Sequence, residues 1–206
     1  MWGPITPKWI GSYEEELHQV ISEIIEAGYE RIVDVGAAEG YYAVGLALKC
    51  KSSKILSFDI DPIARWRQMQ LSRLNEIENL CVGKYCSHAT LSDILTVRSL
   101  LICDIEGYED ELVNPDRVPE LCNTDVLVEI HPFKTKPYER VKENILQRFR
   151  ESHDITIIPT LRRDAKKYLA KEPKLKELGE DCVAKALHEG RGIAQEWLWM
   201  KAKEKC

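Results

Sequence analysis

Residues 31–40 read RIVDVGAAEG, and residues 41–49 continue as YYAVGLALK. A short apolar run therefore leads into a turn that contains Gly36 and Gly40, and a stretch with helical character follows. Glycine lets the backbone turn sharply and approach a ligand closely. The segment predicts a buried strand over 31–35, joined by a glycine-containing loop to a helix over 39–49.

The same alternation of apolar runs and helical stretches continues along the chain. We expect further strands over 54–59, 80–86, 100–105, 125–130, 154–158 and 195–201, and further helices over 12–27, 62–77 and 135–151. The first, second, fourth and fifth runs are almost continuously apolar, as in strands that helices cover on both faces. The last run alternates, with Trp197 and Trp199 on one side, which is typical of an antiparallel strand. The pattern predicts an α/β fold of the Rossmann-like type: a mostly parallel seven-stranded sheet with helices on both faces and an antiparallel last strand.

The chain length of 206 residues suits one domain, and no low-complexity linker interrupts it. We expect a single domain over 1–206 that begins with a helical segment over 1–28. Ser12 and Glu15 have the spacing of a capping box, which places the start of the first helix at Ser12. The charged stretch over 160–190 is predicted to form a helical excursion, which either closes over the site as a lid or packs beside the sheet.

Composition argues against several classes of protein. Charged residues make up 31% and apolar residues 44% of the chain, as in an ordinary globular enzyme. No apolar run approaches the roughly 18 residues of a membrane span, and the first residues lack the pattern of a signal peptide, so we expect no membrane partner and a cytoplasmic location. The seven cysteines include no Cys-x-x-Cys pair, which argues against a disulfide framework and structural zinc. The net charge of -5 gives no general attraction to nucleic acid.

Carboxylates end four of the predicted buried strands. They are Asp34, Asp59, Asp104 and Glu129. In an open parallel sheet, ligands bind outside the carboxyl ends of the strands, near the point where the strand order reverses. Acidic groups gathered there are costly to bury unless they meet hydrogen-bond donors or a cation. The four positions together predict a ligand site.

The charge of the first loop indicates which ligand. Dinucleotide-binding folds place a pyrophosphate on a Gly-x-Gly-x-x-Gly loop, a spacing that this loop lacks. Asp34 and Glu39 would repel phosphate, whereas a sulfonium cofactor with an ammonium group would be attracted. Asp59 can accept both hydroxyls of a ribose, while Asp61, directly before Pro62, is better suited to cap the next helix.

Three segments resemble a known family. DVGAAEGYYAVGLA looks like the cofactor loop and first helix of class I methyltransferases, and CDIEGYEDELV, with TLSDI before it and LVEIHP after it, resembles the FkbM-type methyltransferases. The resemblance covers roughly residues 31–132. It implies the class I methyltransferase version of the Rossmann-like fold, S-adenosyl-L-methionine as the cofactor, and O-methylation of a hydroxyl on a small molecule or sugar.

The resemblance also implies cofactor-binding residues. It carries over to Asp34, Gly36, Gly40 and Asp59, and places Asp104 near the transferred methyl group; Asp59 stands where a glutamate is more usual. Ser87 and His88 are candidates for the adenine contacts. The expected cofactor-binding set is Asp34, Gly36, Ala37, Glu39, Gly40, Tyr41, Asp59, Ile60, Ser87 and Asp104.

Direct methyl transfer to a hydroxyl requires a group that removes its proton, a step that can contribute about 10² to 10⁴ in rate. The candidates are Asp104, Glu106, Glu129 and His131. His131 has the most suitable intrinsic pKa, although it could instead cap the strand through a backbone hydrogen bond. Glu106 and Glu109 could equally cap the following helix. No metal ligand is predicted; magnesium at Asp104, Glu129 and His131 is the alternative, for which a histidine is less typical.

Other functions remain open. The basic stretch over 162–176 is usually a solvated helix face, but it could recruit RNA or another anionic acceptor. Nucleic acid is not the expected partner, and base N-methylation in particular is disfavoured, because the Asp-Pro-Pro-Tyr type of motif that holds an amino nitrogen is absent after the fourth strand. A non-catalytic binding module and a nicotinamide oxidoreductase are further alternatives, the latter opposed by the acidic loop. The sequence does not identify the acceptor or the oligomeric state.

Overall fold

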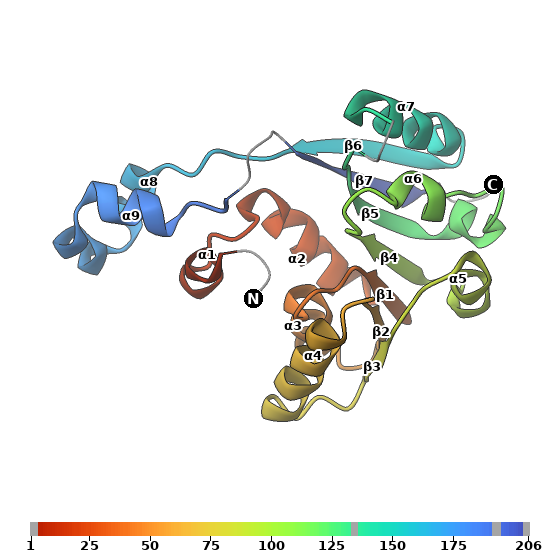
Figure 1. Cartoon of the computed structure of the whole chain (residues 1–206), viewed down its shortest axis with the longest axis horizontal. Helices are drawn as coiled ribbons and strands as arrows, with labels where there is room; N and C mark the ends of the chain where they lie inside the picture. Colours follow the sequence, from red (N-terminus) through yellow and green to blue (C-terminus); the bar gives the residue numbers. More distant parts are fainter. Residues whose placement is uncertain (1–3, 133–135, 191–194, 204–206) are drawn as a thin grey trace.

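A seven-stranded sheet forms the centre of the molecule (Figure 1). The computed structural model describes residues 4–132, 136–190 and 195–203. The strand order is β3-β2-β1-β4-β5-β7-β6, and β7 runs antiparallel to both of its neighbours while β1 to β5 pair in parallel. The strands are β1 (Arg31–Val35), β2 (Lys54–Phe58), β3 (Leu80–Gly83), β4 (Ser99–Cys103), β5 (Asp125–Glu129), β6 (His153–Pro159) and β7 (Glu196–Ala202). The predicted sheet is confirmed, and its order reverses between β1 and β4.

Helices cover both faces of this sheet, as predicted. On one face, α2 (His18–Ala27) and α3 (Tyr41–Lys49) pack on alternate side chains of the strands, such as Ile32 of β1. On the other, α5 (His88–Ile94), α6 (Glu109–Leu112) and α7 (Tyr138–Phe149) pack on Val33 and its neighbours. Because successive side chains of a strand point to opposite faces, the continuous apolar runs supply both cores at once.

The first helix is not the one predicted over 12–27. The chain forms α1 (Ile5–Ile10), then the short 3₁₀ helix η1 (Glu15–Leu17), and α2 begins only at His18. Ser12 caps neither helix: the residues at the N-cap positions of η1 and α2 are Glu14 and Leu17. Glu14 has a left-handed backbone, with φ 48°, and its amide donates to Glu189 Oε1 at 3.1 Å. Tertiary contacts of Glu14 therefore override the local capping signal.

Other boundaries differ by a few residues. The helix predicted over 39–49 begins at Tyr41. Gly40 has φ 95°, which is not a helical backbone conformation, so the helix cannot extend back to residue 39. The helix predicted over 62–77 is α4 (Pro62–Leu74), and the one predicted over 135–151 is α7, with residues 133–135 outside the described residues. Strands β2 and β4 end at Phe58 and Cys103, so that Asp59 and Asp104 directly follow their strands.

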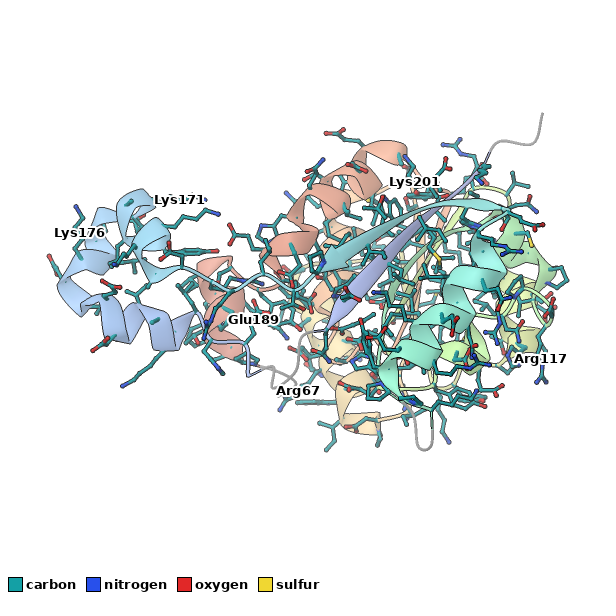
Figure 2. All side chains as sticks on the ribbon, turned by 90° about the horizontal axis from the view of Figure 1, so that it is seen from above. Arg67, Arg117, Lys171, Lys176, Glu189 and Lys201 are labelled. Atoms are coloured by element: carbon teal, nitrogen blue, oxygen red, sulfur yellow. The ribbon has the colours of Figure 1, made fainter. Side chains whose placement is uncertain are left out.

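The excursion between β6 and β7 is helical, as predicted. It contains α8 (Ala165–Lys171), η3 (Pro173–Leu178) and α9 (Glu180–Ala186), which form a small core of their own. Figure 1 shows α8 and α9 standing beside α1 and away from the sheet, and Figure 2 shows the same separation from above. Whether the excursion acts as a lid stays a prediction.

No helix among the described residues combines the length and apolar character needed to cross a membrane.

Candidate functional site

A cavity of about 610 Å³ opens at the carboxyl edge of the sheet, where the strand order reverses. The ends of β1, β2, β4 and β5 and the N-terminal segment form its walls. All four strand-end carboxylates line it, as expected. The other predicted site residues in the lining are Gly36, Ala37, Glu39, Tyr41, Ile60, Glu106 and His131. Gly40 and Ser87 are outside the lining residues.

The loop after β1 packs directly against the end of β4. Gly36 has φ 85°, and a Cβ built there would lie 1.6 Å from the carbonyl oxygen of Asp104. The amides of Gly36 and Ala37 both donate to the carbonyl of Phe58, at 2.9 and 3.2 Å. Gly36 therefore allows the loop after β1 to contact the ends of both β2 and β4 at the cavity.

Asp34 is a buried acid on β1, only 3% exposed. Its carboxylate accepts a hydrogen bond from the amide of Ala43, which lies in the first turn of α3. Its Oδ2 is buried and has no hydrogen-bond partner. Burial, followed by the nearby charges of Asp59 and Glu14, raises the pKa of Asp34 to about 7. Such a carboxyl would gain from a cation in the cavity.

Asp59 and Asp61 have different contacts. The carboxylate of Asp59 accepts hydrogen bonds from the amides of Ala38 and Asp61, each at 2.8 Å, and burial raises its pKa. Asp61 accepts from the amide of Ile63 at 2.8 Å and is the N-cap of α4, which confirms the predicted cap. Since each carboxylate oxygen can accept more than one hydrogen bond, Asp59 retains capacity for two hydroxyls.

The structure does not bring Ser87 to the cavity. Its hydroxyl caps α5 by accepting from the amide of Thr90 at 3.1 Å, and the ring of His88 contacts the carbonyl of Glu111 at 2.8 Å. The connection between β3 and α5 reaches the cavity earlier, through Lys84, Tyr85 and Cys86. Sequence reasoning missed these three because it extended β3 to residue 86.

A histidine and four carboxylates converge beyond β4 and β5. His131, 4% exposed, directs Nδ1 to Glu109 Oε1 at 2.9 Å. Its Nε2 lies 3.9 Å from Asp104 Oδ1, 3.6 Å from Glu106 Oε2 and 3.7 Å from Glu129 Oε2. These three distances are too long for hydrogen bonds.

Electrostatics in this cluster follow from burial and like charge. Burial, followed by the charge of Glu129, raises the pKa of Asp104 well above its ordinary value. For His131, burial alone would lower the pKa, but the hydrogen bond with Glu109 and the surrounding carboxylates outweigh it and raise the pKa. The cluster thus favours positive charge at its centre.

Glu109 organises the loop after β4, a role that the sequence analysis did not assign. It is fully buried and accepts hydrogen bonds from the amides of Ile105 and Gly107, each at 3.1 Å, in addition to contacting His131. Glu106, between these amides, has a left-handed backbone with φ 55°. The sequence shows only that an acidic residue, Glu109, follows Gly107 by two positions. That spacing is equally typical of a residue that caps the next helix.

The N-terminal segment supplies a further wall, whose individual residues the sequence did not identify. Lys8 of α1 forms an ion pair with Glu39 and lies over the ring of Tyr13, 4.6 Å from its centroid. Glu14 accepts a hydrogen bond from the hydroxyl of Tyr42. Glu39, predicted to attract an ammonium group, therefore already has a cationic partner in α1.

Negative charge dominates the cavity. Its acidic lining residues are Glu14, Asp34, Glu39, Asp59, Asp61, Asp104, Glu106, Glu129 and Glu189, and its lysines are Lys8 and Lys84. With low-dielectric walls, such a cleft concentrates cations and disfavours phosphate.

The basic stretch over 162–176 does not face this cavity. Arg163 is buried between Glu16 and Glu189, at 2.7 and 2.5 Å, so it is not part of a solvated helix face. Lys167 pairs with Glu15 at 3.0 Å. Figure 2 shows Lys171 and Lys176 on the excursion, away from the sheet, and Glu189 where the excursion returns.

No family model and no curated protein matches the sequence. Solved structures do match most of the chain. A protein of Klebsiella pneumoniae assigned as an O-methyltransferase aligns with a TM-score of 0.56 and 11% identity, over 93% of this chain and 81% of that chain. TYW2 of M. jannaschii in complex with AdoMet aligns with a TM-score of 0.52 and 14% identity, over 90% of this chain and 76% of that chain. Coclaurine N-methyltransferase bound to N-methylheliamine and SAH aligns with a TM-score of 0.50 and 14% identity, over 91% of this chain and 73% of that chain.

At identities of 11% to 14%, these likenesses speak for the fold alone. The seven-stranded sheet with its antiparallel β7 agrees with them. The chain has the Rossmann-like fold of the class I S-adenosylmethionine-dependent methyltransferases.

Proposed function

We propose that this protein is an S-adenosyl-L-methionine-dependent methyltransferase. The observation that carries the proposal is that Asp34, Asp59, Asp104 and Glu129, located at the ends of four different strands, all line one cavity at the switch point. An acidic cavity without a phosphate-binding loop suits a sulfonium nucleoside better than a dinucleotide. Two proteins of the same fold bind AdoMet or SAH in their structures, which supports the same cofactor here.

The proposed cofactor orientation follows from the contacts of each wall. Asp59 accepts the ribose hydroxyls, with Ile60 beside it at the rim. The loop of Gly36, Ala37 and Gly40 passes beneath the nucleoside, and Asp34 faces the positive charge of the cofactor. Glu39 and Tyr41, which both contact Lys8, form the wall beside the methionine end of the cofactor. Asp104 lies next to the methyl group.

For the acceptor, we propose a hydroxyl on a small molecule or sugar. The segments DIEGYE and EIHP, which resemble the FkbM-type enzymes, form the carboxylate and histidine cluster that lines the cavity beyond β4 and β5. There the acceptor oxygen attacks the methyl carbon, the carbon–sulfur bond breaks with its electron pair left on sulfur, and the cluster of Asp104, Glu106, Glu129 and His131 takes the hydroxyl proton. Holding both reactants in line can contribute on the order of 7–11 kcal/mol. A nucleic-acid acceptor is not proposed, because the buried Arg163 and the paired Lys167 weaken the basic stretch.

Calorimetric titration with S-adenosylhomocysteine tests the proposal without knowledge of the acceptor. We expect saturable binding of about one molecule per chain, and no binding of NAD under the same conditions. Saturable NAD binding with no response to S-adenosylhomocysteine would reverse the assignment.

A further inference from the structure

We propose that Asp104, Glu106 and His131 bind one divalent metal ion where the segments after β4 and β5 line the cavity. The part that this ion plays in methyl transfer rests on the proposed function, but the binding site itself does not. The sequence predicted no metal ligand, and its magnesium alternative did not include Glu106. The structure favours a different set of ligands for a geometric reason.

The geometry of the cluster suits a shared cation. One ligand atom from each of the three residues can be chosen so that all lie within 4.8 Å of one another. Nε2 of His131 lies 3.9 Å from Asp104 Oδ1 and 3.6 Å from Glu106 Oε2. Two ligands that are each about 2.1 Å from one octahedral ion lie about 3.0 to 4.2 Å apart. The two measured separations fall within that range, although they are too long for hydrogen bonds.

A buried imidazole and a buried carboxylate oxygen at this point indicate a ligand independently of the number of acids. The side chain of His131 is 5% exposed, and its Nδ1 is held by Glu109, so Nε2 faces the carboxylates. A carboxylate that holds the second nitrogen of a histidine is the usual outer partner of a metal-bound imidazole. Oδ1 of Asp104 is buried and makes no hydrogen bond. An ion between Nε2 of His131 and Oδ1 of Asp104 would give this buried oxygen a partner.

The ligand atoms also limit the kind of ion. Two carboxylate oxygens and one imidazole nitrogen suit Mn²⁺ and similar divalent transition metals better than Ca²⁺, which takes only oxygen ligands. Glu129 Oε2, 3.7 Å from Nε2, adds negative charge beside the three ligands. The exposed side chain of Glu106 has the freedom to move toward the ion, since 83% of it is accessible.

An ion here would act on the acceptor. A divalent ion lowers the pKa of a bound hydroxyl and orients its oxygen. The proton would pass to the carboxylate of Glu129, the acceptor oxygen would form its bond to the methyl carbon, and S-adenosylhomocysteine would leave. With His131 bound to the metal, Glu129 is the proton acceptor of this scheme.

Titration of Mn²⁺ into the ligand-free protein tests the site directly, since the electron paramagnetic resonance signal of free Mn²⁺ falls as the ion binds. We expect about one ion per chain for the wild type, and affinity lowered by at least about tenfold in Asp104→Asn and Glu106→Gln. Both substitutions preserve shape, and circular dichroism checks that the variants are folded. The matched control is Asp61→Asn, which removes a charge from the same cavity outside the cluster and should keep wild-type affinity.

Two results would overturn the inference: no loss of the free Mn²⁺ signal with the wild type, or equal binding by the wild type and Asp104→Asn. Titration of the same samples with S-adenosylhomocysteine separates this outcome from failure of the proposed function. Nucleoside binding without Mn²⁺ binding contradicts the metal site alone. Mn²⁺ binding without nucleoside binding contradicts the methyltransferase assignment and supports the metal site.

Discussion

At the scale of single residues, the acids of the cavity are held at a cost to the ligand-free fold. Asp34 is buried with Oδ2 unpaired, and its pKa is raised to about 7. A carboxyl group whose pKa is raised in the folded state stabilises the fold at low pH relative to high pH. Natural sites often retain such groups because the ligand, when bound, compensates them.

Replacing Asp34 with asparagine should therefore stabilise the ligand-free protein in a pH-dependent way. The folded protein binds more protons than the unfolded chain between about pH 4 and pH 7, so wild-type stability falls as pH rises through this window. An asparagine side chain does not titrate, and the advantage of Asp34→Asn should grow by up to about 1.4 kcal/mol per pH unit there. Urea unfolding of both proteins at pH 5 and pH 8 measures the difference. An equal difference at the two values would show that Asp34 does not titrate as described.

Asp59 should matter more for the cofactor than its neighbour. Asp59→Ala removes up to two charge-assisted hydrogen bonds to the ribose, each contributing about 1.5–3 kcal/mol, so affinity for S-adenosylhomocysteine should fall by tenfold or more. Asp61→Asn keeps the cap of α4 and should bind like the wild type. Calorimetric titration of both variants with S-adenosylhomocysteine provides the comparison. A loss of affinity confined to Asp61→Asn would assign the ribose contact to Asp61 instead.

Sequence reasoning placed some site residues and missed others for a physical reason. Asp34 and Asp104 could be placed because strand periodicity fixes where a strand ends, and parallel strands share one carboxyl edge. Lys8 and Glu14 reach the cavity only through tertiary contacts of the N-terminal segment. Nothing in a local pattern encodes those contacts.

At the scale of elements, the turn between β1 and α3 depends on two glycines with positive φ, Gly36 and Gly40. The strand and the body of the helix were predictable, but the helix start at Tyr41 was not, because it depends on the left-handed backbone of Gly40. The prediction of a capping box at Ser12 was wrong for a related reason, since Glu14 adopts a left-handed backbone to contact Glu189.

A pair of glycine substitutions tests this turn. Gly36→Ala would place Cβ 1.6 Å from the Asp104 carbonyl oxygen, so it should lower the free energy of unfolding by about 2 kcal/mol or more. Gly45→Ala lies inside α3, where the added Cβ would meet no atom within 4 Å apart from the adjacent residues and the helix backbone, so it should raise the free energy of unfolding by up to about 1 kcal/mol. Urea unfolding distinguishes the two. Similar effects from both substitutions would contradict the close packing of the β1–α3 loop on β4.

At the scale of the whole molecule, a buried ion pair anchors the helical excursion to the N-terminal segment. Arg163 bonds to Glu16 and Glu189 and donates to the carbonyl of Ser12 at 2.9 Å. The sequence predicted a charged, helical excursion over 160–190. It did not predict where the excursion docks, because Arg163 reads locally as one more exposed basic residue.

Arg163→Met should release the excursion. Removing one partner leaves buried carboxylates uncompensated, which typically costs about 3–5 kcal/mol. We expect faster amide hydrogen exchange in α8 and α9, measured by mass spectrometry. Lys166→Met is the control, since its pair with Glu180 is exposed and spans 3.9 Å, so exchange there should match the wild type. Unchanged exchange in Arg163→Met would show that the docking does not depend on this ion pair.

The central claim is that the acidic cavity at the carboxyl edge holds the cofactor. A crystal structure with S-adenosylhomocysteine tests it most directly. We predict the nucleoside in this cavity, with both ribose hydroxyls within hydrogen-bond distance of Asp59 and the sulfur facing Asp104. A nucleoside bound elsewhere on the protein, or in this cavity with its ribose away from Asp59 and its sulfur away from Asp104, would contradict the account.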